Sequence, residues 1–319
     1  MFEKYLIDMS NEDDNLVWQK PTTPTGRQRK FTPAFGPEGK DEIGDILYSA
    51  VGKNIYYHEH LDGCETFFFV DGEWEGYSMG KRFPIHPGEI LHIQPYQGHG
   101  FQTLEDHGRV IVMFQSKDMR YGLERNMYLR EHHPEYAASP AHRRRSLESN
   151  HDLMRSMSFE NMPLGDAPSH RRFGEGIQTH ELPGLTLHLT VARYETHGVK
   201  EVWEMEMKQG LSVGFVEPRI DQHLFWIREG AVEFNIDGEV FTAKPDNLVY
   251  VPPYRCFSWK ALEDSNMVDM DCPFLLQDYL EELEQLHLTG SEQLKDEAFM
   301  EELRDRYRMV PYTYTYEPV

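Results

Sequence analysis

The chain has 319 residues, enough for two domains of ordinary size, and 39% of them are hydrophobic, so it can build substantial cores. Its formal net charge of −22 at pH 7 argues against nucleic acids and anionic membrane surfaces as partners, because both would repel an acidic surface. The simplest role of this charge is to keep the protein soluble.

The sequence also bears on the compartment. It has no stretch of about 20 apolar residues, so no transmembrane helix is expected. The first residues, Met-Phe-Glu-Lys-Tyr-Leu-Ile-Asp-Met, show no signal-peptide pattern. The three cysteines, Cys64, Cys256 and Cys272, are an odd and scattered set, which fits a reducing compartment. We therefore expect a cytoplasmic protein.

The N-terminal third of the chain reads as a small β-barrel. Residues 1–34 are polar and rich in turns, and we expect them to wrap this barrel. After them, short strand patterns alternate with turns, as in a jelly roll. The predicted strands are 46–51, 54–60, 66–70, 74–78, 89–94, 99–104 and 110–115.

Four side chains in this region have the chemistry of a metal site. His58 and His60 lie one residue apart in a predicted strand, so both imidazoles face the same side. Glu65 follows after a tight turn, and His99 enters a later strand after a proline-containing loop. Imidazole and carboxylate together suit a divalent transition metal, so we expect these four residues to converge on one ion.

The spacing of these residues resembles the first motif of the cupin superfamily. Five residues match that motif: Gly52, His58, His60, Glu65 and Gly72. In the second motif Gly88 and His99 match, whereas Gln94, Tyr96 and Thr103 depart from the usual Pro, Gly and Asn, which puts the loop shape in doubt rather than the ligand. The resemblance implies an all-β jelly-roll barrel with one metal ion held by His58, His60, Glu65 and His99.

Strand alternation also predicts the lining of the pocket. Tyr56 shares the parity of His58, so its phenol should point inward as a proton donor or acceptor, or as a barrel-filling residue. Phe67 and Phe69 share the parity of Glu65, and Phe101 that of His99. We expect an aromatic substrate pocket formed by Tyr56, Phe67, Phe69 and Phe101, in which Glu65 could leave the metal to act as a base.

Residues 117–180 are predicted to form a helical linker between two domains. Apolar residues at helical spacing predict a helix over 119–132. The basic cluster Arg143–Arg145 has two interpretations: it could bind a carboxylate, or it could be a solvated or salt-bridged part of the linker.

An internal repeat predicts a second barrel. At a constant offset of 158 residues, glycines, prolines and aromatic residues recur, as in the pairs Gly72/Gly230 and Tyr96/Tyr254. The chain therefore resembles a bicupin, with an N-terminal barrel at 1–116 and a degenerate one at 181–274. Three predicted ligands are lost in the second copy: Val216, Pro218 and Phe257 stand opposite His58, His60 and His99.

We therefore expect the second barrel to be free of metal. Its interior would be filled by Phe225, Phe257 and Trp259. His223 stands opposite Glu65, and the sequence leaves open whether it is functional or a hydrogen-bonded structural residue.

The segment 275–319 is predicted to contain two helices and a tail. Residues 275–286 carry an amphipathic pattern, and the capping box at Thr289–Glu292 predicts the start of a second helix that runs through Tyr307. The tail alternates as a strand would. The acidic helices and the tyrosine-rich tail make a homodimer the expected assembly.

The predicted site favours an enzyme that acts on a small molecule. Four ligands on a roughly octahedral ion leave positions open for a substrate or dioxygen. The resemblance implies a mononuclear non-haem iron dioxygenase for a small oxygenated or aromatic compound, with manganese, nickel, zinc or copper as other candidates. The alternatives are an oxygen-independent isomerase or lyase of a small organic acid, and a non-catalytic small-molecule-binding protein.

Overall fold

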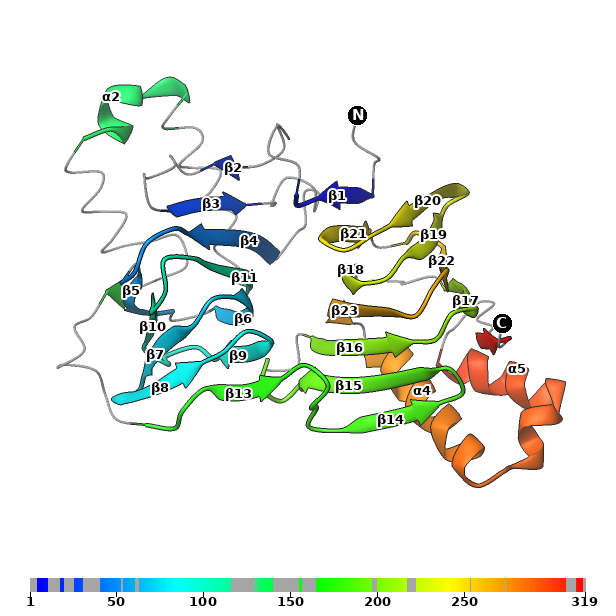
Figure 1. Cartoon of the computed structure of the whole chain (residues 1–319). Coiled ribbons are helices and arrows are strands. Elements are labelled where there is room, and N and C mark those ends of the chain that lie inside the picture. The colour runs from blue at the N-terminus through cyan, green and yellow to red at the C-terminus, as the bar shows by residue number, and fades with distance from the viewer. Residues whose placement is uncertain are drawn as a thin grey trace. The chain divides into compact units, whose positions relative to one another are not determined.

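The computed structural model describes most of the chain, in two compact units. The described residues are 5–10, 18–19, 26–30, 41–52, 54–60, 63–115, 129, 131–139, 155–156, 165–196, 200–216, 222–252, 254–272, 274–307 and 314–317. One unit, here the N-terminal unit, spans Asp14–Arg172. The other, the C-terminal unit, combines Met1–Asp13 with Phe173–Val319. Both are built of antiparallel strands (Figure 1).

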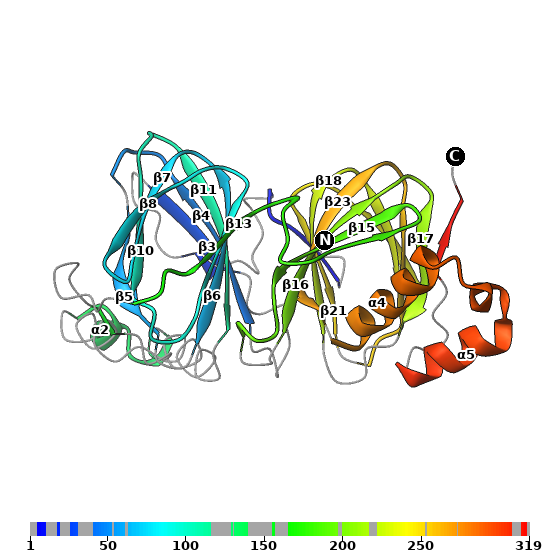
Figure 2. The same ribbon diagram turned by 90° about the horizontal axis from the view of Figure 1, so that it is seen from below.

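The N-terminal unit is a sandwich of two sheets that face each other (Figure 2). The larger sheet has the order β13 (Ser169–Arg172), β9 (Glu89–Ile93), β6 (Cys64–Asp71), β11 (Gly108–Gln115), β4 (Asp41–Tyr48), β3 (Gly26–Lys30), β2 (Trp18–Gln19). The smaller sheet has the order β12 (Arg155–Ser156), β5 (Asn54–Glu59), β10 (His99–Thr103), β7 (Trp74–Ser78), β8 (Lys81–Ile85). A short helix, α2, covers Pro134–Ala137.

Alternate side chains of these strands form the core between the two sheets. The aromatic residues Phe67, Phe69, Trp74 and Phe101 are at most 1% exposed and pack with aliphatic residues of β9 and β11. This is the all-β jelly-roll architecture that the sequence predicted. The strand pattern missed β8, because Pro84 weakens its signal; a proline is acceptable there since β8 is an edge strand. It also missed β2 and β3, in the segment expected to wrap the barrel, and β12 and β13, in the segment expected to be a helical linker.

The C-terminal unit repeats the same plan. Its larger sheet has the order β1 (Leu6–Asp8), β21 (Asn247–Val251), β18 (His223–Glu229), β23 (Ser265–Cys272), β16 (Glu201–Met207), β15 (Leu185–Val191), β14 (Thr179–Leu182). Its smaller sheet has the order β20 (Glu239–Ala243), β19 (Val232–Ile236), β22 (Phe257–Ala261), β17 (Leu211–Val216), β24 (Tyr314–Tyr316). Phe225, Phe257 and Trp259 fill its core, as the alignment of the repeats predicted.

The internal repeat is confirmed by the backbone as well as by the strand order. Strands β7 to β10 and β19 to β22 are related by the same offset of 158 residues. The backbone takes a left-handed conformation at equivalent places, with φ of 65° at Tyr96 and 63° at Tyr254, and 78° at Gly72 and 76° at Gly230. Turns with the same geometry therefore close both barrels.

Two segments lie elsewhere than the sequence suggested. We expected residues 1–34 to wrap the first barrel. Strands β2 and β3 do extend its larger sheet, but β1 pairs with β21 of the C-terminal unit, where Tyr5, Ile7 and Met9 are buried. We expected a helical linker at 117–180, but the described part of it also contains β12, β13 and the start of β14. Leu129, Glu131 and His132 are helical, whereas the rest of the helix expected at 119–132, and Arg143–Arg145, lie outside the described residues.

The C-terminal helices differ slightly from the expectation. Helix α4 covers Phe274–Leu288 and buries Tyr279, Leu280 and Leu283. Ser291 caps only a short 3-10 turn, η3 (Glu292–Lys295). The second helix, α5, covers Glu297–Arg306 and is capped by Asp296, whose Oδ1 accepts hydrogen bonds from two backbone N–H groups. Asp296 is the stronger cap because it begins the longer helix.

The tail forms β24 and pairs with β17 of its own chain. Among the described residues, no helix is both long and apolar enough to cross a membrane.

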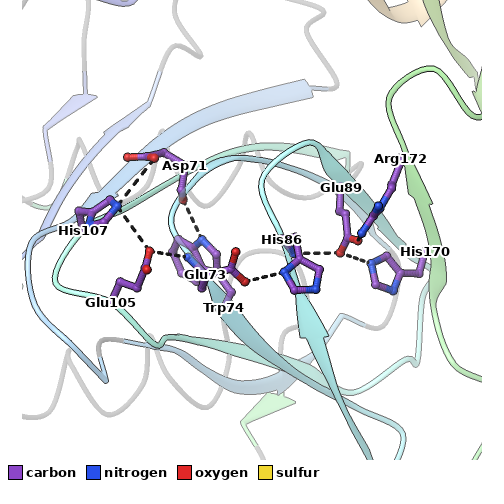
Figure 3. Close-up of polar contacts among 9 residues, drawn as sticks. All are labelled: Asp71, Glu73, Trp74, His86, Glu89, Glu105, His107, His170 and Arg172. Atoms are coloured by element: carbon purple, nitrogen blue, oxygen red, sulfur yellow. Dashed lines mark hydrogen bonds and ion pairs between the residues drawn. The ribbon is translucent and has the colours of Figure 1, made fainter.

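A polar network lies at the end of the N-terminal barrel where β6 terminates (Figure 3). Its best-buried charged member is Glu89, whose side chain is 5% exposed. The Glu89 carboxylate accepts hydrogen bonds from His170 Nε2 at 2.7 Å, Arg172 Nε at 2.8 Å and the His86 backbone N–H at 2.9 Å. Because His170 and Arg172 belong to β13, these bonds fasten β13 to β9.

The environment of Glu89 favours its charged form. Burial opposes ionisation, but the hydrogen bonds from His86, Arg172 and His170 outweigh it and lower the pKa of Glu89. A carboxyl group whose pKa is lowered in the folded state stabilises that state above its unfolded pKa of about 4.3, and the stabilisation is lost as the pH falls through the folded pKa.

We predict that Glu89→Gln lowers the free energy of unfolding by about 1–3 kcal/mol at pH 7, because it removes a charged acceptor from three donors. The difference from the wild type should shrink as the pH falls below about 4. Urea unfolding at several pH values measures this. Asp106→Asn, at an exposed ion pair of the same unit, is the control and should change little. A difference between Glu89→Gln and wild type that is independent of pH would contradict the assignment.

A second prediction concerns Gly72, which has a φ of +78°. A Cβ at this position would lie 2.5 Å from the His107 carbonyl oxygen. Gly72→Ala should therefore cost about 3 kcal/mol in unfolding free energy, of which about 1–2 comes from the left-handed backbone and the rest from the contact. The control is Gly52→Ala: Gly52 has a φ of +72° but nothing within 4 Å, so only the backbone cost applies. Equal losses in the two variants would show that the close approach is unimportant.

Candidate metal centre

Three strands bring the four candidate ligands together. His58 lies in β5, and His60 follows that strand. His99 opens β10 and pairs directly with His58 across the antiparallel ladder. Glu65 is the second residue of β6 and lies on the facing sheet, opposite Ile93 and Phe114. All four side chains point into the barrel because each has the inward parity of its strand.

Their donor atoms converge closely. The Nε2 atoms of His58 and His60 are 3.0 Å apart. Glu65 Oε2 lies 2.8 Å from His99 Nε2, 3.1 Å from His60 Nε2 and 3.9 Å from His58 Nε2. All four ligand atoms lie within 4.8 Å of one another. The histidine side chains are at most 6% exposed and that of Glu65 is 12% exposed, so water reaches the cluster only narrowly.

The backbone orients the imidazole of His99. Its Nδ1 lies 2.9 Å from the Gln97 carbonyl oxygen, which can only accept, so Nδ1 carries the proton and donates it. The Nε2 of a neutral His99 then directs its lone pair toward Glu65. The Tyr96 backbone N–H also donates to the His60 carbonyl oxygen at 2.7 Å, which ties the loop before β10 to the histidine strand. Such outer contacts orient metal ligands.

Glu65 is held in its charged form. Burial alone would raise its pKa, but the charges and hydrogen bonds of His60 and His99 outweigh burial and hold the pKa of Glu65 well below its usual range. The site therefore contains a carboxylate that faces three imidazole nitrogens, which is a donor set that suits a divalent transition metal.

The distances also fit an ion. Neighbouring ligands that each lie about 2.1 Å from a metal are about 3 Å apart at a right angle. The pairs His58–His60, His60–Glu65 and His99–Glu65 lie between 2.8 and 3.1 Å. In the absence of a cation, buried lone pairs this close would repel each other unless a proton lay between them. These four side chains therefore fit a metal ion.

Aromatic rings surround the cluster. The rings of Phe67 and Phe101 have their centroids 5.9 and 6.0 Å from that of His99. Phe69 lies farther along β6, where it packs against Trp74 and Phe101. The three phenylalanines expected in the pocket thus belong to the barrel core, and Phe67 and Phe101 also adjoin the site.

Two of the residues at the site were missed from the sequence. The Phe114 ring lies 4.6 Å from that of His60, and Gln97 supplies the carbonyl that orients His99. Phe114 was recognisable by its inward parity with Val110 and Val112, whereas a backbone carbonyl leaves no sequence signal. The side chain of Tyr56, the candidate proton donor, lies outside the described residues.

The neighbouring histidines of the motif have other partners. His92 is 1% exposed and bonds to Thr66 Oγ1 at 2.9 Å through Nδ1. His86 is partly exposed and lies 2.5 Å from Glu73 Oε2.

Comparison with known proteins gives the following relatives. No protein-family model matches the chain. The chain is 23% identical over 253 residues to the quercetin 2,3-dioxygenase of Bacillus subtilis (strain 168), with 74% of each chain covered. It is similar in structure to the Lactobacillus farciminis oxalate decarboxylase in its formate complex, with a TM-score of 0.55, 12% identity and coverage of 85% of this chain and 86% of that one.

A Bacillus subtilis oxalate decarboxylase studied for its Mn(II) centres is also similar, with a TM-score of 0.54, 12% identity and coverage of 92% of this chain and 86% of that one. At these identities the solved structures show a shared fold. The two-barrel arrangement of strands in this chain is therefore the one that these enzymes share.

Proposed function

We propose that the chain, which has a two-barrel bicupin fold and one buried cluster of three histidines and a glutamate, is a mononuclear non-haem iron dioxygenase acting on a small oxygenated or aromatic compound. The observation that carries the proposal is the convergence of His58, His60, Glu65 and His99 on one point. A six-coordinate ion held by four protein ligands keeps two positions for exogenous ligands, and open positions distinguish a catalytic site from a closed structural one.

The choice of a dioxygenase rests on two supports. A relative that is similar in sequence, at 23% identity over 74% of each chain, is a quercetin 2,3-dioxygenase. The walls of the site beside His60 and His99 are phenyl rings, which suit a planar aromatic substrate.

The chain's own residues have separable roles in this proposal. A bound metal would supply Lewis acidity toward a substrate oxygen and positions for substrate and dioxygen. His99, fixed by the Gln97 carbonyl, presents its Nε2 to the ion. Phe67, Phe101 and Phe114 limit the access of water. Glu65 Oε2 is the carboxylate oxygen in the cluster, and we propose it as the atom that receives the proton of a substrate hydroxyl.

A second candidate is an oxygen-independent lyase of a small organic acid. It is supported by the similarity of the fold to oxalate decarboxylases, one of them in a formate complex. The same four ligands serve iron, manganese and several other ions, so they do not select between the two chemistries.

We also propose that the protein is a homodimer, as the acidic C-terminal helices and the tyrosine-rich tail led us to expect.

We predict about one equivalent of transition metal per chain, with iron as the first candidate, in protein purified without added metal or chelator. Elemental analysis should show its loss from His58→Ala/His99→Ala, because two of the four ligands are removed. His86→Ala is the control, since His86 lies outside the cluster and is partly exposed. Metal that persists in the double variant would overturn the site.

We also predict that the iron-loaded protein consumes dioxygen when it turns over phenolic or diketone compounds. Glu65→Gln should lower kcat by about a hundredfold, because the amide is a weaker ligand and cannot accept the proton. An oxygen electrode and product analysis measure both effects. Turnover of a carboxylic acid at the same rate without oxygen, with none consumed in air, would instead establish the lyase.

A further inference from the structure

The C-terminal barrel has a buried polar pair at the level where the N-terminal barrel has its metal cluster. His223 opens β18 and stands where Glu65 stands in the first repeat. Asp269 of β23 pairs with Phe225 of β18. In the N-terminal barrel, Val112 pairs in the same way with Phe67. An aspartate has therefore replaced an inward-facing valine, and it faces the histidine that replaces Glu65.

The two side chains form a dyad inside an apolar core. Both are 0% exposed, and His223 Nδ1 lies 2.7 Å from Asp269 Oδ2. The imidazole stacks on Phe225, with ring centroids 5.2 Å apart and planes inclined by 7°, and it meets Phe257 edge-on at 4.9 Å. The other ring nitrogen, Nε2, is buried and has no hydrogen-bond partner among the residues that the structure describes.

Stability does not explain this arrangement. Taking a carboxylate and an imidazole out of water is costly, and apolar residues of similar size at such positions are often equally or more stabilising. The valine of the first barrel shows that the fold accepts an apolar residue at the position of Asp269. An orphaned Nε2 adds a further cost, because buried polar atoms are almost always paired. The dyad also resembles the way in which a carboxylate orients a histidine toward a ligand.

We propose that the C-terminal barrel binds a small, neutral aromatic molecule that carries a hydroxyl group, of which phenol is the simplest example. The hydroxyl group would bond to His223 Nε2, and the ring would lie against Phe225 and Phe257. A hydroxyl group can both donate and accept, so it matches Nε2 in either protonation state. A neutral ligand is favoured over a charged one because the core around the dyad is apolar, and burying a charge in such a core is costly.

This site is separate from the metal centre and from the proposed dioxygenase activity. Val216 and Phe257 occupy two of the positions equivalent to metal ligands, and the described residues of this barrel hold no group of three metal donors. The proposal therefore requires that the C-terminal barrel binds its ligand when no metal is present.

The test uses the full-length His58→Ala/His99→Ala variant, in which a phenol cannot bind to a metal. Calorimetric titration should show one phenol per chain, bound at least about tenfold more tightly than toluene, which has the ring but no hydroxyl. Adding His223→Phe should weaken phenol binding by at least about tenfold and remove the preference over toluene. Adding Asp269→Asn, which nearly preserves volume, should weaken phenol binding in the same direction.

His188→Gln is the matched control, because His188 is a buried histidine of the same unit that bonds to Thr179, and it should leave phenol binding unchanged. Circular dichroism checks that each variant is folded. If His223→Phe fails to fold, the phenol affinity of the Asp269→Asn variant tests the proposal instead. The proposal is overturned if the parent binds no phenol at millimolar concentration, binds toluene equally well, or retains its affinity in both dyad variants. Failure of the metal site would leave these results unaffected.

Discussion

The functional interpretation depends on four electron-rich atoms held close together inside a barrel. Three imidazole nitrogens and a carboxylate oxygen lie within 4.8 Å of one another, so their lone pairs repel unless a proton or a cation lies between them. A cation resolves this conflict. The surrounding phenyl rings and the low exposure strengthen the effect, since electrostatic interactions are larger where water is scarce.

The two barrels show what this constraint requires of the fold. They share strand order, turn conformations and the aromatic filling of the core, so the sandwich persists without metal ligands. The N-terminal barrel uses its interior for three histidines and a glutamate. The C-terminal barrel keeps a fully buried polar pair, His223 and Asp269, beside the aromatic residues of its core. The scaffold therefore tolerates polar chemistry at this level but does not depend on it.

In each unit, a strand from outside the repeated strands completes the larger sheet. The first sheet is extended by β13, which Glu89 binds through His170 and Arg172 at the end of the barrel away from the metal cluster. The corresponding place in the second sheet is taken by β1 from the start of the chain. These strands lie far in sequence from the strands they pair with. Burial of Tyr5, Ile7 and Met9 and the charge on Glu89 hold them in place.

The sequence by itself determined the fold class, the repeat and the four candidate ligands. Strand alternation places His58 and His60 on one face, and the constant offset of 158 residues relates the second barrel to the first. These signals are local or periodic, so they can be read without coordinates. The same reasoning placed Phe67 and Phe101 inside the barrel.

Only the tertiary structure decided which distant groups meet. The pairing of β1 with β21, the carbonyl that orients His99 and the partnership of Asp269 with His223 each join residues through backbone geometry or long-range pairing. A backbone carbonyl carries no residue identity. In β23 the register differs by one position from the constant offset, which brings Asp269 rather than Met270 to the inward face. Register depends on neighbouring strands, and a shift of one residue exchanges the two faces of a strand.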